Sequence, residues 1–243
     1  MARMPKERVV RKLRSAVALA AALLIAVIPV SGRAADLPTT APIAGEHPTA
    51  ARPIQADFGD QAASNDARRI ADWALSSQDN ADLPFVIIDK TAAKVFVFNR
   101  LGTLQGASLA LLGMALGDDS VPGIGDRKLS AIPPRDRTTP AGRFVASLGR
   151  DLKTDILWVD YKDAISLHRV INGAPSDRRL QRLATASPLD KRITFGCINV
   201  PVRFYEGVVK KAFTGTVGIV YILPETKALE RVFAIGDARA PGR

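Results

Sequence analysis

The chain has 243 residues, 47% of them hydrophobic, which is enough to bury the core of one or two domains and excludes a chain that is disordered throughout. It contains one cysteine, so a scaffold held by internal disulfides is also excluded. The formal net charge is +10, but half of this excess lies in the first fourteen residues, which argues against a nucleic-acid interface on the folded part.

Residues 1–35 have the three parts of a secretory signal peptide. A basic head is followed by the apolar run 16–28 and by a small-residue segment that ends in Ala34 and Ala35. Because a membrane-spanning helix needs about 20 apolar residues, this shorter run predicts cleavage near Ala34 or Ala35 and export to the periplasm or cell envelope. The alternative is an uncleaved anchor, in which case the protein would meet the membrane only through this leader.

The next segment, 36–60, contains four prolines and no apolar periodicity, which predicts a flexible linker. His47 lies within it without neighbours at metal-ligand spacing, so we expect a solvated residue and no metal site there. In the segment 61–82, Ser64 is placed to cap a short helix whose apolar face carries Trp73.

The segment 83–225 has the pattern of a mainly β domain with a few short helices. Runs of β-branched and aromatic residues, separated by short polar turns, predict two hairpins and a last strand that stops at Pro224. The expected strands, in chain order, are 85–88, 95–98, 107–115, 144–148, 156–161, 164–170 and 217–223. The segment 226–243 is expected to be a frayed polar tail.

The loop 117–126 holds three aspartates and three glycines. It lacks the alternating ligands and final glutamate of a calcium loop, and it lacks the Lys-Ser/Thr ending of a phosphate loop. We therefore expect an ordinary exposed loop.

Cys197 is the single thiol of the chain, so in an oxidising, exported compartment it has no internal disulfide partner. A nucleophilic thiol needs a base, and His168 is the one histidine in the predicted folded region. Strand alternation puts Ser166 and His168 on one face and Ile165 on the other. A packing cysteine and a structural histidine remain the alternatives at this point.

The sequence around Cys197 gives two further expectations. A helix that begins after Pro201 would favour the thiolate through the positive end of its dipole. Gly196 permits the close approach of a substrate carbonyl, and the backbone N–H groups of Gly196 and Cys197 are candidate oxyanion-hole donors.

The segment 194–199, Thr-Phe-Gly-Cys-Ile-Asn, resembles the Ser/Thr-His-Gly-Cys signature of the L,D-transpeptidase (YkuD-like) catalytic domain. The segment 139–144 is similar to the Thr-Pro-x-Gly-x-Phe segment of that family, and the strand pair at 86–89 and 95–98 also resembles it. The resemblance covers about 84–223. It implies a β-sandwich-like catalytic domain with a few short helices.

The resemblance also implies roles for individual residues. Cys197 matches the nucleophile and His168 the base. The residues implied around them, as substrate-binding or oxyanion residues, are Thr194, Gly196, Asn199 and Arg169. Charge alone makes Arg143, Arg169 and Arg192 candidates for binding carboxylates of the donor.

The implied function is that of an exported, cysteine-dependent peptidoglycan L,D-transpeptidase. Cys197 would be acylated by a tetrapeptide stem and would pass the acyl group to an amine acceptor, with no metal or organic cofactor. The implied partners are peptidoglycan stem peptides, and an envelope protein is a further candidate acceptor.

Three departures from the family pattern bear on the substrate. Phe195 replaces the histidine that precedes Gly-Cys, and Arg169 stands where the family tends to have glycine. The insertion 172–191, a candidate lid or specificity wall, lengthens the interval between His168 and Cys197 to 29 positions. The alternatives are therefore an L,D-carboxypeptidase or hydrolase, a non-catalytic peptidoglycan-binding module, or an exported β domain whose cysteine only packs.

Overall fold

The computed structural model describes residues 55–151, 154–171 and 173–235. The predicted signal peptide, His47 and most of the predicted linker lie outside these residues. Within the described ranges, none of the helices has the length and apolar character needed to cross a bilayer.

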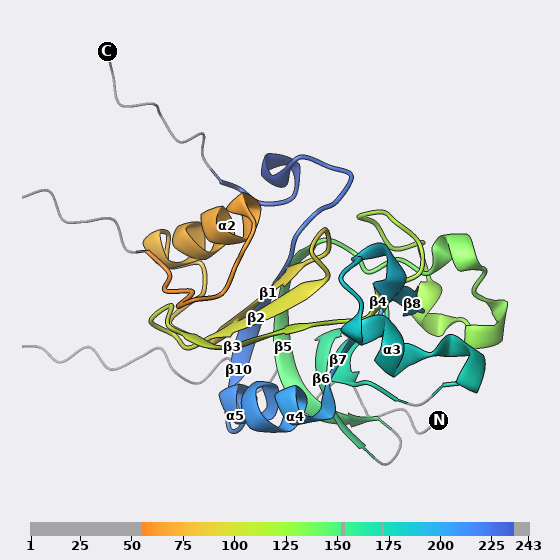
Figure 1. Cartoon of the computed structure of the whole chain (residues 1–243). Helices are drawn as coiled ribbons and strands as arrows, with labels where there is room; N and C mark the ends of the chain where they lie inside the picture. Colours follow the sequence, from red (N-terminus) through yellow and green to blue (C-terminus); the bar gives the residue numbers. More distant parts are fainter. Residues whose placement is uncertain (1–54, 152–153, 172, 236–243) are drawn as a thin grey trace, which may run out of the picture. The chain divides into compact units, whose positions relative to one another are not determined.

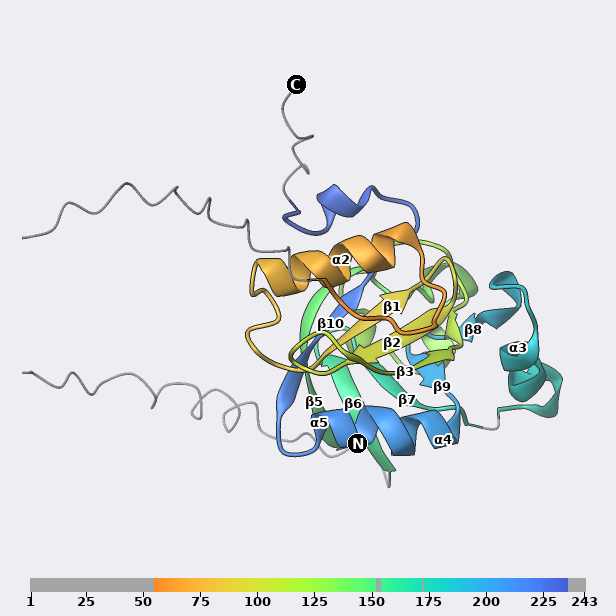
Figure 2. The same ribbon diagram turned by 60° about the vertical axis from the view of Figure 1, so that its left-hand side comes forward.

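The dominant element is one mixed sheet of eight strands in the order β3-β2-β1-β10-β5-β6-β7-β9. Its strands are β1 (Phe85–Asp89), β2 (Lys94–Phe98), β3 (Leu104–Leu109), β5 (Gly142–Asp151), β6 (Thr154–Asp160), β7 (Ile165–Arg169), β9 (Ile198–Val200) and β10 (Val217–Ile222). The sheet curves until it is nearly a barrel (Figure 1, Figure 2). Beyond β3, Leu111 exchanges two backbone hydrogen bonds of 2.8 and 2.9 Å with Asn199 of β9, which brings the two edges of the sheet together.

The mainly β character predicted from the sequence is confirmed, but the sandwich-like arrangement is replaced by one curved sheet. Hydrogen bonding runs without a break from β3 to β9, so the described strands do not divide into two large stacked sheets. The other sheet contains β4 (Leu112–Gly113) and β8 (Arg192–Thr194), which pair in parallel. Strand twist allows one large sheet to curl around its own inner core.

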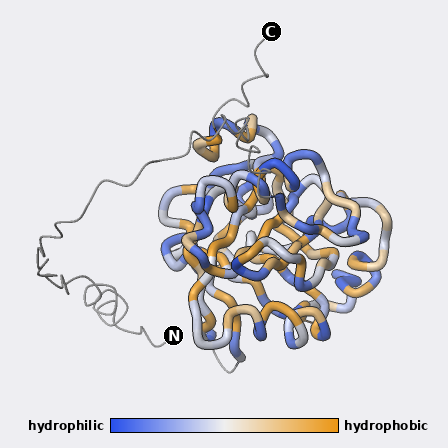
Figure 3. The backbone as a smooth tube through the Cα atoms, turned by 90° about the vertical axis from the view of Figure 1, so that its left-hand side faces the viewer, coloured by the Kyte–Doolittle hydropathy of each residue, from blue (hydrophilic) through white to orange (hydrophobic). Residues whose placement is uncertain are grey.

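Two apolar cores lie on opposite faces of this sheet. Val86 and Ile88 of β1 belong to the inner core, and Phe85 and Ile87 belong to the outer one, so β1 is buried along its whole length. Figure 3 shows hydrophobic segments running through the middle of the molecule and hydrophilic segments around it.

The predicted N-terminal helix is confirmed as α2 (Asn65–Ser76), which covers the outer core. Ser64 caps it by accepting a hydrogen bond of 3.1 Å from the backbone N–H of Ala67. Trp73 is only partly buried and meets Tyr221 edge to face, with the ring centroids 6.2 Å apart.

The two predicted hairpins and the last strand are also confirmed. β1 pairs with β2 and β6 pairs with β7, both antiparallel, while β10 lies between β1 and β5. The expected strand 107–115 differs, because β3 begins earlier and ends at Leu109. Leu109 is opposite Lys94, the first residue of β2, so no partner remains in β2 for the residues that follow.

The predicted helix after Pro201 is confirmed and closes the inner core. It consists of α4 (Val202–Phe204), the π-helical η7 (Tyr205–Val209) and α5 (Lys210–Phe213). Its fully buried side chains are Tyr205, Val209 and Phe213.

The predicted boundaries of the linker and the tail are wrong. Phe58, in the predicted linker, is 3% exposed and packs edge-on to Phe96 and Phe98. Leu229 and Phe233, in the predicted tail, are 3% and 4% exposed and belong to the same outer core. These apolar residues hold both segments on the domain, because they cover an apolar face of the sheet that would otherwise be exposed to solvent.

Two long connections carry six further short helices, and η8 (Leu229–Arg231) follows β10. The insertion 172–191, of which residue 172 is not described, contains η5 (Pro175–Asp177), α3 (Arg179–Ala184) and η6 (Leu189–Lys191). Figure 1 and Figure 2 both place α3 beside β8. The connection from β4 to β5 contains η2 (Ile124–Asp126), η3 (Leu129–Ala131) and η4 (Pro134–Asp136).

Candidate active site

Cys197 lies between β8 and β9 and is half-buried. Gly196, the residue before it, has a φ of 130°, which is a conformation that favours glycine. A Cβ at Gly196 would lie 2.7 Å from the carbonyl oxygen of Thr138. The close approach that requires this glycine is therefore made by the protein's own backbone, and this was not expected from the sequence.

The sulfur of Cys197 faces the β6–β7 hairpin. Ser166 Oγ donates a hydrogen bond to Sγ at 3.5 Å, and Sγ donates to the carbonyl oxygen of Ala164 at 3.6 Å. The thiol is therefore held between two residues of one hairpin, and its contacts are those of a weak donor and acceptor.

Strand register brings His168 to the same side. β7 and β9 are parallel neighbours, and His168 lies opposite Asn199. Ile165 and Leu167 belong to the inner core, while Ser166 contacts the thiol, so the predicted alternation along β7 is confirmed.

Both ring nitrogens of His168 have partners. Nδ1 is 2.7 Å from the carbonyl oxygen of Arg169, and Nε2 is 3.0 Å from Asn199 Nδ2. A neutral ring with its proton on Nδ1 satisfies both contacts, because Nδ1 then donates and Nε2 accepts. In this state Asn199 occupies the nitrogen that would take the thiol proton.

The insertion determines how Asn199 is turned. Nη1 of Arg179, at the start of α3, donates to Asn199 Oδ1 at 3.1 Å, which leaves Nδ2 to face His168. Arg179 is itself paired with Asp177 at 3.0 Å. The insertion thus reaches the site through a chain that runs from Arg179 to Asn199 to His168.

The environment of Cys197 lowers the pKa of its thiol. Burial acts to raise the pKa of Cys197, but the interaction with His168 and the hydrogen bonds from Ser166 outweigh it, so the pKa is lowered. The two side chains have no formed hydrogen bond in the described structure, since His168 already uses both nitrogens. We therefore attribute the coupling to the proximity of the two groups, as in resting sites whose contacts tighten on substrate binding.

The pKa of His168 is shifted in the opposite direction to that of Cys197. Burial acts to lower the pKa of His168, yet the Cys197 thiolate and the Arg169 carbonyl oxygen outweigh it, so the pKa is raised. The charge of Arg179 opposes this rise. A lowered thiol pKa and a raised imidazole pKa together favour transfer of the proton from sulfur to His168.

Two threonines fix the backbone at the thiol. Thr194 Oγ1 donates to the carbonyl oxygen of Cys197 at 2.6 Å and accepts from the N–H of Gly196 at 3.1 Å. Thr139 Oγ1 donates to the carbonyl oxygen of Gly196 at 2.8 Å and accepts from the N–H of Gly113 at 2.9 Å. Thr194 and Gly196 are thus brought to the thiol as expected, and Thr139 is an addition.

These bonds reduce the two N–H donors that the sequence suggested for an oxyanion hole to one. The N–H of Gly196 is used by Thr194 and is not a ready donor. The N–H of Cys197 has no hydrogen-bond partner among the described residues. It is therefore the donor of this pair that remains for a substrate oxygen.

The expected contribution of the helix dipole is not supported by the geometry. β9 (Ile198–Val200) lies between Cys197 and the first helical residue, Val202. An extended strand rises about 3.3 Å per residue, and the dipole effect falls off within the first helical turn. The pKa of the thiol is lowered by neighbouring side chains, with His168 first among them.

The structure places Arg169 on the other face of β7. Its guanidinium is ion-paired with Asp155 at 3.0 Å and with Glu206, and it lies 4.1 Å from the centroid of the Tyr205 ring. Only the backbone carbonyl of Arg169 reaches His168.

Arg143 and Arg192, the other candidates for binding carboxylates, are also paired. Arg143 Nε donates to Asp79 at 2.5 Å. Arg192 is paired with the buried Glu225. All three arginines singled out by charge therefore already bind carboxylates of the protein itself.

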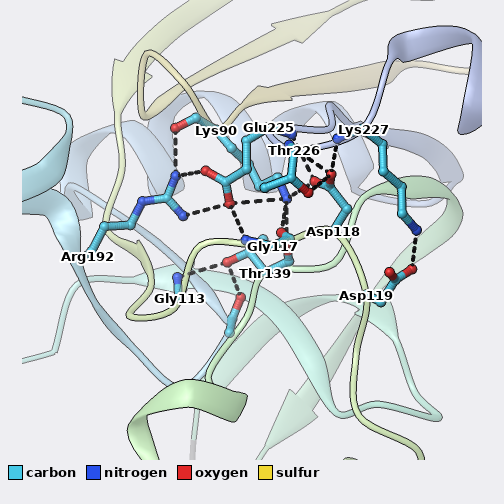
Figure 4. Close-up of polar contacts among 11 residues, drawn as sticks. Lys90, Gly113, Gly117, Asp118, Asp119, Thr139, Arg192, Glu225, Thr226 and Lys227 are labelled. Carbon is cyan, nitrogen blue, oxygen red and sulfur yellow. Dashed lines mark hydrogen bonds and ion pairs between the residues drawn. The ribbon is translucent and has the colours of Figure 1, made fainter.

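The loop 117–126 is not the ordinary exposed loop that was expected. Lys90 Nζ donates to Asp118 at 2.7 Å, and both side chains are fully buried (Figure 4). Asp118 also accepts backbone N–H bonds from Glu225 and Thr226 at 2.8 and 2.9 Å. Burial acts to raise the pKa of Asp118, but Lys90 and these donors lower it well below its usual range. A buried lysine elsewhere in the chain makes this aspartate structural, and a loop sequence gives no sign of that.

An aromatic pair lies on the hairpin that faces the thiol and was not singled out in the sequence. Trp158 lies directly opposite Ser166 on the neighbouring strand, so both side chains share a face. Tyr161 stacks on Trp158 with the ring centroids 4.7 Å apart and is 63% exposed. The two rings therefore lie on the face of the hairpin that carries Ser166.

No protein-family model matches this sequence, and no curated protein matches it. In the described ranges, no group of three or more His, Cys, Asp or Glu side chains is placed to hold a metal ion. The interpretation of the site therefore depends on its geometry and on the chemistry of its residues.

Proposed function

We propose that this protein is a cysteine acyltransferase with L,D-transpeptidase chemistry that acts on peptidoglycan stem peptides. The observation that carries the proposal is the arrangement of Cys197, Ser166, His168 and Asn199 on the neighbouring strands β7 and β9. The direction of the two pKa shifts adds to it, since the thiol pKa is lowered and the imidazole pKa is raised.

The two sequence segments that resemble the L,D-transpeptidase family also meet in space. Thr139, which begins one segment, donates a hydrogen bond to the carbonyl oxygen of Gly196 in the other at 2.8 Å. The two residues are 57 positions apart in the chain, so it is the tertiary structure that brings the two segments together. This contact supports the proposed fold family as well as the activity.

In the proposed first half-reaction, the hydrogen bond between Asn199 Nδ2 and His168 Nε2 breaks first. His168 Nε2 then takes the proton from the thiol of Cys197. Cys197 Sγ then attacks the carbonyl carbon between an L-centre and the terminal D-residue of a tetrapeptide stem. The N–H of Cys197 donates to the oxyanion. The C–N bond breaks as His168 returns the proton to the leaving amine, which leaves an acyl thioester and a free D-amino acid.

In the second half-reaction, an amine of another stem attacks the thioester carbonyl. His168 takes a proton from the attacking nitrogen and gives it to the departing sulfur, so an amide forms and the thiol is restored. Water in place of the amine would give the carboxypeptidase outcome by the same steps.

The proposal includes export by residues 1–35, so the substrate and the site would share the cell envelope. This follows from the signal-peptide pattern of the leader. Amino-terminal sequencing of the protein recovered from the envelope fraction checks the site of cleavage.

The test of the activity uses purified mature protein and disaccharide-tetrapeptides. Wild type is expected to give cross-linked dimers, with tripeptides if water competes, and Cys197→Ala is expected to give neither. Mass spectrometry of the products separates transfer from hydrolysis. Identical product profiles for wild type and Cys197→Ala, with both proteins folded by circular dichroism, would falsify the proposal.

A further inference from the structure

Arg137 is the arginine beside the thiol site that has no carboxylate partner. It precedes Thr138, whose carbonyl oxygen would lie 2.7 Å from a Cβ at Gly196. In the part of the chain that the structure describes, no acid lies within ion-pair distance of Arg137. The adjacent Asp136 pairs instead with Arg127 at 3.3 Å and with Arg135 at 3.7 Å.

The guanidinium of Arg137 is nevertheless held in place. It lies over the ring of Phe195, 3.9 Å from the ring centroid. Its Nε donates to the carbonyl oxygen of Ile132 at 3.0 Å. The two terminal nitrogens have no hydrogen-bond partner among the described residues, and they carry four of the five N–H donors of a guanidinium.

An aromatic ring orients a cation without neutralising it. The cation–π contact with Phe195 fixes the plane of the guanidinium, and its full positive charge remains for a ligand. A planar, oriented guanidinium with free terminal nitrogens is suited to a carboxylate, which it binds through two parallel hydrogen bonds. Phe195 stands where the resembled family has histidine, and it orients the guanidinium of Arg137.

The position of Phe195 places this charge at the edge of the site. Phe195 is two residues before Cys197, so their Cα atoms are at most about 7 Å apart. In a stem peptide, the carboxylate of the terminal residue is separated from the scissile carbonyl carbon by one nitrogen and one α-carbon. The terminal carboxylate is therefore the charged donor group nearest to the scissile bond. Arg137 is the candidate to bind it, because its guanidinium lies on the ring of Phe195 and the carbonyl oxygen of Thr138 lies against Gly196.

We propose that Arg137, positioned by Phe195, binds a carboxylate of the donor peptide, and that this carboxylate is the terminal one beside the scissile bond. The proposal rests on the proposed function for the identity of the donor. It assigns specificity to a residue outside the two motif segments 139–144 and 194–199. It predicts that donors ending in a free carboxylate are preferred over the same donors ending in a carboxamide.

The test compares Arg137→Gln with wild type on two tetrapeptide donors that differ only in this terminal group. For the free carboxylate, loss of a charged hydrogen-bonding partner is expected to raise KM roughly 10- to 100-fold with a smaller change in kcat. For the carboxamide, Arg137→Gln and wild type are expected to agree within about threefold. Arg137→Lys, which keeps the charge but loses the planar fork, should fall between them.

Two controls separate recognition from folding. Arg135→Gln removes an arginine that is 84% exposed and lies two residues away, and it is expected to leave both donors unchanged. Phe195→Leu keeps the apolar volume but loses the aromatic face, and it is expected to raise KM for the carboxylate donor alone. Thermal melting of each variant shows that it is folded.

An equal loss of Arg137→Gln on both donors, or no loss on either, overturns the inference. If wild type turns over neither donor, the proposed function fails, and binding then decides the inference by itself. In that case calorimetry with Cys197→Ala should still show tighter binding of the carboxylate peptide than of the carboxamide, and the added Arg137→Gln change should abolish the difference. Equal binding of the two peptides would overturn the inference as well.

Discussion

The molecule contains two polar clusters that differ in how completely they are satisfied. In the first, Lys90 and Asp118 are fully buried, and Lys90 makes hydrogen bonds to Gly117, Asp118 and Thr139 at 2.5, 2.7 and 3.0 Å. In the second, the half-buried Cys197 has contacts of 3.5 and 3.6 Å, and the N–H of Cys197 has no partner within the described ranges. Full pairing in a buried place supports structure, whereas incomplete pairing at an accessible place leaves capacity for a substrate.

The two clusters are connected through Thr139. Its carbonyl oxygen accepts from Lys90, and its hydroxyl donates to the carbonyl oxygen of Gly196. The first cluster, around Lys90 and Asp118, is the ion cluster. It also connects the chain after β10 to the loop 117–126, because Asp118 accepts hydrogen bonds from Thr226 and its neighbours. Rigid pairing in one cluster therefore holds the backbone on which the other performs its proposed chemistry.

The largest effect is expected from His168→Gln, which removes the proposed base. The rate of acylation by a tetrapeptide donor should fall roughly 10²- to 10⁴-fold, the usual contribution of general acid–base catalysis. The thiol pKa should also change. It is lowered in the wild type, so thiolate is present at a lower pH than for an ordinary thiol, and without His168 the opposing effect of burial should raise it.

Alkylation by iodoacetamide as a function of pH measures this shift without any substrate. The midpoint should move to higher pH in His168→Gln and move less in Ser166→Ala, whose contact with Sγ is long at 3.5 Å. An unchanged midpoint in His168→Gln would show that His168 does not control the thiol.

The next effect is on stability, from Asp118→Asn in the ion cluster. The change leaves the buried Lys90 with Glu225 as its remaining carboxylate partner, at 3.4 Å and shared with Arg192. Breaking a buried ion pair on one side typically costs about 3–5 kcal/mol of unfolding free energy, and Glu225 should hold the loss toward the lower end of this range. Urea denaturation measures this loss. Asp119→Asn is the matched control, because Asp119 is 74% exposed and its pair with Lys227 should be worth no more than about 1 kcal/mol.

The same variant has a pH signature. The pKa of Asp118 is lowered in the folded protein, so its contribution is fully present above the unfolded value of about 3.9 and is lost as pH falls toward the folded value. Wild type should therefore lose more stability below about pH 4 than Asp118→Asn does. Parallel acid profiles for the two proteins would contradict the assignment.

A smaller effect is expected where the two clusters meet. Thr139→Val leaves the N–H of Gly113 and the carbonyl oxygen of Gly196 without their buried partner, at a cost of about 1–3 kcal/mol. Acylation should slow as well, since the backbone at the thiol loses a support. Thr138→Val is the control, because the Thr138 hydroxyl makes no hydrogen bond within the described residues. Comparable losses in both variants would indicate a packing effect.

Local sequence patterns predicted much of the fold and part of the site. The hairpins, the last strand and the Ser64-capped helix were predictable because each depends on residues close in the chain. The placement of Ser166 and His168 on one face followed from the two-residue period of a strand. Pairing of His168 with Asn199 depends on the parallel register of β7 and β9, which no local pattern predicted. The resemblance suggested only that the two residues belong to one site.

The sequence by itself determined that a single thiol and a single folded-region histidine exist, and that the histidine projects from the face opposite the inner core. Only the tertiary structure decided which charges are satisfied. Arg143, Arg169 and Arg192 find carboxylates of the protein, while Arg137 rests on Phe195 without one. Ion pairing depends on distances between residues far apart in the chain, and a pattern of residue types contains no such distances.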